Sequence, residues 1–157
     1  MAFADVTLAS AGFDVPTLNA EDFEGTMHTA YRSYVHAAGD DTGLIDLLKL
    51  PAGRIKVYSM TSRLQTSQFA VGSLLTIGTR EYVDESGATV VDDPDRFALD
   101  LAAGAGALDQ FLPLPSTNAG VSELDSQDGI TVYASVDTAN IEDGDTIDLA
   151  MVYSKIA

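Results

Sequence analysis

The stretch ITVYASVDTANIEDGDTIDLAMVY, residues 130–153, decides the fold. Apolar residues occupy every second position in its first part, and the same alternation returns after Asp143-Gly144. A period of two places alternate side chains on opposite faces of a β-strand, and Asp-Gly is a common turn between strands. The stretch therefore predicts two half-buried strands separated by a hairpin-type turn.

Shorter segments of the same kind precede this stretch. Further strands are predicted at 26–36, 44–50, 54–58, 74–83, 88–91 and 107–112, with Gly, Asp and Pro in the connections between them. Many short strands separated by such turns are typical of an antiparallel β-sandwich or a jelly-roll-like fold. The fold class is therefore mainly β, with a core predicted to contain Ile55, Val57, Ile77, Val132, Leu149 and Met151.

One segment, residues 93–103, predicts a short α-helix. Asp93 suits the N-cap position and Pro94 the first helical position, while Gly104 is a natural stop. Phe97 and Leu101 are four residues apart, as on one face of a helix. We also expect Arg96 to meet Asp100.

Length and composition predict one soluble β-sandwich domain over residues 27–157. The chain has 157 residues, of which 46% are hydrophobic and none is cysteine. No apolar run approaches the roughly 18–20 residues of a membrane span, and the first residues lack the pattern of a secretory signal. Residues 1–26 show no sustained period and are interpreted as an extended N-terminal arm, whose Phe3, Leu8 and Phe13 are candidate contacts with another surface.

The charge is strongly acidic and unevenly distributed. The formal net charge is −16, which disfavours nucleic acids and anionic membranes as partners. Residues 32–80 hold six bases and three acids, whereas residues 81–148 hold sixteen acids and one base. Arg54 and Lys56 alternate with Ile55 and Val57, so both bases should share one strand face. We expect this basic strip to meet an acidic surface at a subunit boundary or on a partner.

No pattern of catalytic or metal-binding residues emerges, so we predict a non-enzymatic protein with no cofactor. His28 and His36 would lie about 26 Å apart on a straight strand, too far to share a metal, and are expected on a strand surface. The acidic turns at 92–95 and 142–145 could bind calcium, but neither fits the EF-hand pattern. Paired carboxylates of a small acidic hydrolase remain a minor alternative.

Several motifs in order resemble a family of virion proteins. The segment GDDTGLIDLLKLPAG (39–53) resembles a Gly-Asp to Leu-Pro-Ala-Gly segment of tailed-bacteriophage head decoration proteins, also called cement or capsid-stabilising proteins. LTIGT (75–79), the Asp-Pro-Asp-x-Phe segment beginning at Asp93, and a closing strand over 144–153 resemble later segments of these proteins in the same order. The resemblance covers about residues 26–156 and departs in the N-terminal leader and at 63–73.

The resemblance implies a β-sandwich that binds the outer surface of a phage capsid and stabilises the head. Its partners would be the major capsid protein and further copies of itself, in a homotrimer or another cyclic homo-oligomer. The protein would be located in the virion, at the outer surface of the capsid head, and would be assembled there in the host cytoplasm. Two alternatives stay open: a tail or fibre component of a virion, and a carbohydrate-binding β-sandwich module.

Overall fold

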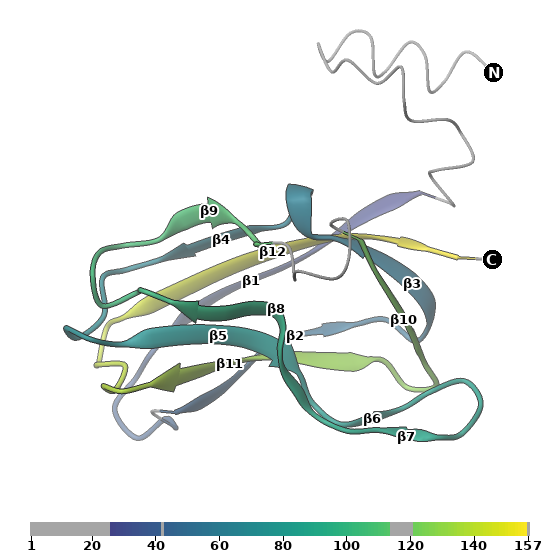
Figure 1. Cartoon of the computed structure of the whole chain (residues 1–157), viewed down its shortest axis with the longest axis horizontal. Coiled ribbons are helices and arrows are strands. Elements are labelled where there is room, and N and C mark those ends of the chain that lie inside the picture. Colours follow the sequence, from purple (N-terminus) through teal and green to yellow (C-terminus); the bar gives the residue numbers. More distant parts are fainter. Residues whose placement is uncertain (1–25, 42, 114–120, 157) are drawn as a thin grey trace, which may run out of the picture.

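The computed structural model describes residues 26–41, 43–113 and 121–156, which form two antiparallel sheets packed face to face (Figure 1). The six-stranded sheet is named sheet A, and the four-stranded one is named sheet B. A small hairpin extends from sheet B and consists of β6 (Tyr82–Val83) and β7 (Thr89–Val90). The architecture is a jelly-roll-like β-sandwich, so the predicted fold class is confirmed.

Sheet A is organised around one long strand, β12 (Thr146–Lys155). On one edge β12 pairs along most of its length with β1 (Met27–Val35). On the other edge it pairs with β4 (Arg63–Thr66) near its start and with β3 (Gly53–Tyr58) near its end. The sheet is completed beyond β4 by β9 (Asp109–Phe111) and beyond β3 by β10 (Val121–Ser126). A single 3₁₀ turn, η1 (Ser59–Thr61), connects β3 to β4.

Sheet B has the order β2–β11–β5–β8. Its strands are β2 (Leu44–Leu50), β11 (Ile130–Asp137), β5 (Leu74–Thr79) and β8 (Asp93–Leu101). The connections cross repeatedly between the sheets. For example, β1 of sheet A leads into β2 of sheet B, and β11 of sheet B leads into β12 of sheet A. The edge strands β1 and β2 lie beside each other on the same side of the sandwich.

The core lies between the two sheets and is built by the alternation seen in the sequence. All six residues predicted for the core are fully buried, and strand β12 contributes Ile147 to the same cluster. Burial of one such side chain stabilises a protein by about 1.5–3 kcal/mol. The period-two pattern of the sequence therefore gives the inward face of each sheet correctly.

The predicted helix at 93–103 is wrong, because this segment is strand β8. The segment pairs with β5 from Asp93 to Leu101, with two irregularities in its register, and this pairing decides against a helix. Pro94 is tolerated because β8 is an edge strand, where a missing N–H breaks no ladder. The Arg96 guanidinium lies 3.5 Å from an Asp93 carboxylate oxygen, so the expected contact with Asp100 is replaced by one with Asp93. Asp100 has a positive φ of 50°, which interrupts the regular strand geometry.

Other predicted elements differ in detail. The turn at Gly144, with φ of 89°, is present, but it connects a strand of sheet B to a strand of sheet A and joins no hairpin. The segment predicted as one strand over 74–83 divides into β5 and β6. Strands β4 and β10 were not predicted. β4 has only four residues, and β10 has acidic residues at alternate positions, so neither shows clear apolar alternation.

The glycine at position 78, in LTIGT, is required for steric reasons. A Cβ atom on this residue would overlap the backbone of Asp93 and Pro94, where β8 passes over β5. Glycine therefore permits the close approach of the two strands.

Phe97 tests the reassignment of this segment to a strand. Phe97 is fully buried whereas Leu99 is 59% exposed. We expect Phe97→Ala to lower the free energy of unfolding by about 3–5 kcal/mol through the cavity that it leaves. Leu99→Ala should change it by no more than about 0.5 kcal/mol. Denaturant titration of both variants measures the difference, and equal losses would contradict the assignment.

Candidate interaction surface

The side of sheet A that faces away from sheet B, called here the outer face, carries a row of residues from four neighbouring strands. Tyr31 on β1 is opposite Ala150 on β12, Ala150 is opposite Arg63 on β4, and Arg63 is opposite Phe111 on β9. Adjacent strands are about 4.8 Å apart, so the row spans about 14 Å. Ala150 is small, so the row is low next to Tyr31.

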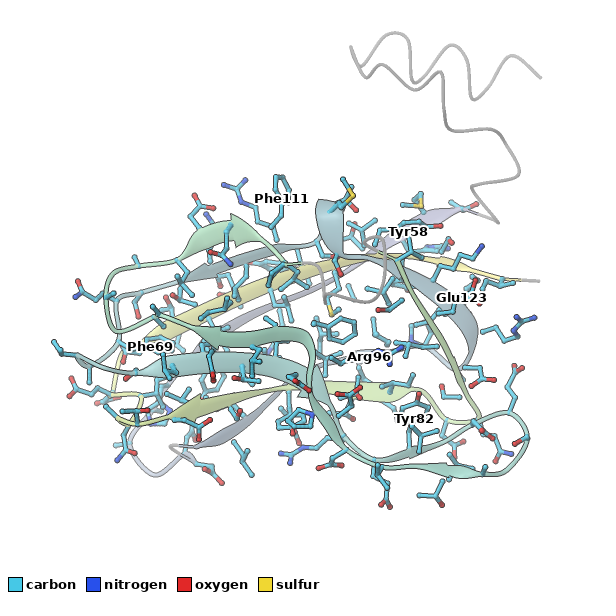
Figure 2. All side chains as sticks on the ribbon, viewed as in Figure 1. Tyr58, Phe69, Tyr82, Arg96, Phe111 and Glu123 are labelled. Carbon is cyan, nitrogen blue, oxygen red and sulfur yellow. The ribbon has the colours of Figure 1, made fainter. Side chains whose placement is uncertain are left out.

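Large apolar side chains are exposed on and around this row. Tyr31 is 64% exposed and Phe111 is 59% exposed, and Figure 2 shows Phe111 pointing away from the sandwich. Met27 and Val35 on β1 and Met60 on η1 are exposed as well. Exposed apolar residues that gather on one face typically mark an interaction site.

A ladder of charged pairs occupies the other end of the outer face. In the register of β3 with β10, Lys56 is opposite Glu123 and Arg54 is opposite Asp125. Lys56 Nζ lies 3.7 Å from a Glu123 carboxylate oxygen. Ile55 and Val57 are buried on the opposite side of β3, so the predicted orientation of Arg54 and Lys56 holds. Their role at a subunit boundary stays a prediction, and the structure adds acidic neighbours for both within the same chain.

A second ion pair lies within the apolar row. The Arg63 guanidinium donates two hydrogen bonds to one carboxylate oxygen of Asp109, at 2.7 and 2.9 Å. These hydrogen bonds hold the pKa of Asp109 below its usual range. Arg63 is therefore neutralised locally, and its alkyl stem adds apolar surface beside Phe111.

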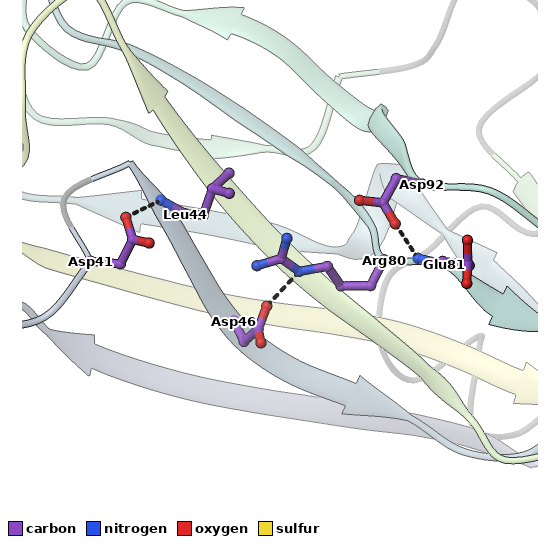
Figure 3. A network of polar contacts seen from close by, with 6 residues as sticks. All are labelled: Asp41, Leu44, Asp46, Arg80, Glu81 and Asp92. Atoms are coloured by element: carbon purple, nitrogen blue, oxygen red, sulfur yellow. Dashed lines mark hydrogen bonds and ion pairs between the residues drawn. The ribbon is translucent and has the colours of Figure 1, made fainter.

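The outward side of sheet B differs because its central aromatic residue is covered. The Arg80 guanidinium lies 4.2 Å from the centre of the Tyr133 ring and donates a 2.8 Å hydrogen bond to Asp46. Figure 3 shows the hydrogen bond from Arg80 to Asp46 beside the one from Glu81 N to Asp92. The cation over the ring uses the aromatic surface within the chain. Leu44 and Leu99 are exposed on sheet B, but the large exposed aromatic residues, Tyr31 and Phe111, lie on sheet A.

The two histidines occupy different environments. His28 is exposed on β1 and stacks on Tyr153, with ring centres 5.4 Å apart. His36 lies just beyond the end of β1 and is buried, so the expectation that it lies on a strand surface is wrong. Its Nδ1 atom is 3.0 Å from the Tyr34 hydroxyl, which donates to Asp40 at 2.9 Å. This cluster fixes the connection between β1 and β2.

The acidic segment 92–95 lies mostly in strand β8, while the acidic turn at 142–145 and the turn at Asp41 use their carboxylates to organise the backbone. Asp145 accepts hydrogen bonds from Glu142 N and from the Ser67 hydroxyl, at 2.8 and 2.9 Å. Asp41 accepts from the backbone N–H groups of Gly43 and Leu44, which lowers its pKa. Across the described residues, no three His, Cys, Asp or Glu side chains form a group that could hold a metal ion. The same ranges contain no helix long and apolar enough to cross a membrane.

Two parts of the predicted interface have different outcomes. Phe3, Leu8 and Phe13, with nearly all of the predicted arm, lie outside the described residues. The exposed residues of β1 and β9 were missed as interface candidates. The available signal was Tyr31, an aromatic residue that shares strand parity with Met27 and Val35.

Comparison with solved structures finds a chain with a similar fold. A chain from the capsid of Ralstonia phage GP4 superimposes with a TM-score of 0.62 and 16% identity, covering 92% of this chain and 94% of that one. Chains from the cyanophage Pam1 capsid and the Helicobacter pylori bacteriophage KHP30 capsid give TM-scores of 0.48 and 0.46, at 13% and 14% identity. They cover 89% and 86% of this chain, and 99% and 92% of their own lengths. The shared fold rests on the first match alone.

Sequence comparisons add no family assignment. No protein-family model matches the chain, and no curated protein matches it. The likeness to the chain from the Ralstonia phage GP4 capsid, at 16% identity, therefore shows a shared fold.

The Tyr34 cluster gives a pH-dependent prediction. Burial and the hydrogen bond to Asp40 raise the pKa of Tyr34 to about 12 from its ordinary 10. The neutral phenol is thus favoured in the folded state, and its contribution is complete below pH 10 and lost as pH rises toward 12. Tyr34→Phe should lower stability by about 1 kcal/mol at neutral pH. Wild type should then lose stability relative to this variant between pH 10 and 12, as urea titrations at each pH would show; a constant difference would contradict the assignment.

Proposed function

We propose that this protein is a structural component of a phage virion that binds the outer surface of the capsid and stabilises the head. The capsid fold match and the motif resemblance to decoration proteins both support the proposal. Many copies on a symmetric shell can bind through modest contacts, because the contacts repeat.

The observation that carries the proposal is the apolar outer face of sheet A. A chain of net charge −16 has ample polar surface for solubility, yet Tyr31 and Phe111 remain largely exposed on this face. Large aromatic side chains are enriched among the residues that dominate binding energy in interfaces. We therefore assign the apolar row as the centre of contact with the major capsid protein.

The charged ladder of β3 and β10 fits the rim of the same contact. Interfaces commonly have an apolar centre and a polar rim, and rim charges govern association rate and register more than affinity. Arg54 and Lys56 would then face a neighbouring subunit or the shell, in a cyclic homo-oligomer that we propose to be a homotrimer. The arm residues Phe3, Leu8 and Phe13 are proposed to add apolar contact with a neighbouring molecule.

The carbohydrate-binding alternative has less support. Tyr31 and Phe111 are the exposed aromatic residues of the row, and strands β12 and β4 lie between them. A flat sugar-binding platform needs aromatic rings close together in one plane. The arrangement on the outer face is instead suited to two separate contact points on a protein.

Phe111 provides the first test of the proposal. Purified protein would be incubated with capsids of its phage assembled without it, and binding measured by co-sedimentation. We expect Phe111→Ser to weaken binding at least tenfold, about 1.4 kcal/mol or more, as expected for a residue central to an interface. Leu99→Ser is the matched control, because Leu99 is equally exposed, at 59%, but lies on sheet B. Absence of wild-type binding, or equal effects of the two variants, would refute the proposal.

A charge exchange tests the ladder. The double variant Arg54→Glu, Lys56→Glu places like charges opposite Glu123 and Asp125, so part of any effect would arise within the chain. Adding Glu123→Lys and Asp125→Lys restores opposite charges across the strands and keeps the net charge of wild type. If the strip contacts a neighbour, the fourfold variant should regain thermal stability but still assemble or bind more weakly than wild type at low salt. Full recovery of both properties would show that the ladder acts only within one chain.

A further inference from the structure

Strand β1 has one unpaired edge. Among the described strands it pairs only with β12, in a continuous register from Met27 to Val35 without a bulge. Nine residues of regular edge strand expose a row of backbone N–H and C=O groups that another strand can pair with.

The other edge strands of the sandwich carry features that hinder such pairing. β2 contains a bulge opposite β11 and exposes Asp46 and Lys49. β8 contains Pro94 and two irregularities in its register with β5. β9 is only three residues long, and β10 exposes Glu123 and carries Asp125. Charges, prolines, bulges and short length are the usual means by which proteins block edge strands.

Strand β1 has none of these features apart from one charged residue. Its sequence MHTAYRSYV contains no proline and no acidic residue, and Arg32 is its single formal charge. Its outer-face residues include Met27, Tyr31 and Val35, all exposed. An accessible, regular and largely apolar edge is therefore retained in a chain whose other edges are blocked.

The direction of the backbone shows which residues are available. His36 N donates a 2.8 Å hydrogen bond to Asp145 O, in the same register as the β1–β12 pairs. Alternate residues of an antiparallel strand direct their N–H and C=O groups to opposite sides. The odd-numbered residues of β1, from Met27 to Val35, therefore direct these groups away from β12.

The same strand is complementary to itself when two copies run antiparallel about a two-fold axis at Tyr31. In that register Tyr31 is opposite Tyr31, Met27 is opposite Val35, and Thr29 is opposite Ser33 on the outer face. On the other face Arg32 is opposite Ala30, so the single charge never meets its own copy. Aromatic and apolar cross-strand pairs each stabilise a sheet by several tenths of a kcal/mol or more, whereas directly opposed like charges destabilise it.

We propose that two copies of this protein pair through the free edge of β1, in the antiparallel register centred on Tyr31. Sheet A then continues across the two-fold axis, and the apolar rows of the two outer faces join into one. The contact is isologous, since each copy presents the same strand. It does not depend on capsid binding, and it can link copies that also form rings through other surfaces.

A charge at the axis tests the dimer. In the register centred on Tyr31, Tyr31→Lys places two ammonium groups opposite each other. We expect sedimentation velocity of the full chain at physiological salt, which screens the net charge of each copy, to give a dimer for wild type, or paired rings where the cyclic oligomer also forms in solution. The dissociation constant should rise at least tenfold for Tyr31→Lys. Val71→Lys, at an 88% exposed residue outside the strands, should leave it unchanged. Circular dichroism confirms that each variant is folded.

Cysteine crosslinking tests the register itself, and the chain has no cysteine to interfere. Opposed residues of an antiparallel pair have Cα atoms about 4.5–5.5 Å apart, within the range of a disulfide. Tyr31→Cys should form a covalent dimer on mild oxidation. Val35→Cys alone should not, because its two copies would be about 26 Å apart at 3.3 Å per residue. A mixture of Val35→Cys and Met27→Cys should crosslink.

Two results would overturn the proposal. One is a wild-type chain that stays monomeric, or forms only oligomers that Tyr31→Lys leaves intact. The other is crosslinking of Val35→Cys to itself as efficiently as Tyr31→Cys, which would place the axis elsewhere or indicate random collision. Loss of capsid binding by Phe111→Ser with an unaltered dimer would separate the two surfaces.

Discussion

The structure depends on the backbone pairing of β12, which serves three strands at once. One edge is matched by β1, and the opposite edge is shared between β4 and β3, so that β9 and β10 join the sheet only through these partners. The inward residues Ile147, Leu149 and Met151 are fully buried against sheet B. Hydrogen bonding along one strand and burial of its inward face therefore fix both layers of the sandwich and the placement of the outer row.

The contrast between the two sheet surfaces follows from the chemistry of single positions. Tyr133 is a buried aromatic residue on the outward side of sheet B, and Arg80 covers its ring while bonding to Asp46. Tyr31 has Ala150 as its cross-strand neighbour, which is too small to cover a ring. One tyrosine is thus used within the chain, and the other is available to a partner. This difference gives the sandwich one preferred side for contact with a partner.

Local alternation of apolar residues was enough to predict the fold class, the core and the orientation of Arg54 and Lys56. It failed at residues 93–103, where capping residues typical of a helix belong to an edge strand and pairing with β5 overrides local preference. It also could not place Glu123 opposite Lys56, because the register between segments far apart in sequence is set by the whole sheet. The outer row was missed for the same reason: its four residues come from four separate segments.

The position of β12 in the sequence has a consequence for synthesis. Residues 35 and 146, which pair at the end of the β1–β12 ladder, are 111 positions apart. During translation β1 therefore emerges long before its partner, with both edges free and Tyr31 exposed. Contacts of such long range fold slowly, and unpaired apolar strands are prone to associate between chains. Synthesis of this protein in quantity should thus require ribosome-associated chaperones, which keep β1 from associating with other chains until β12 has been made.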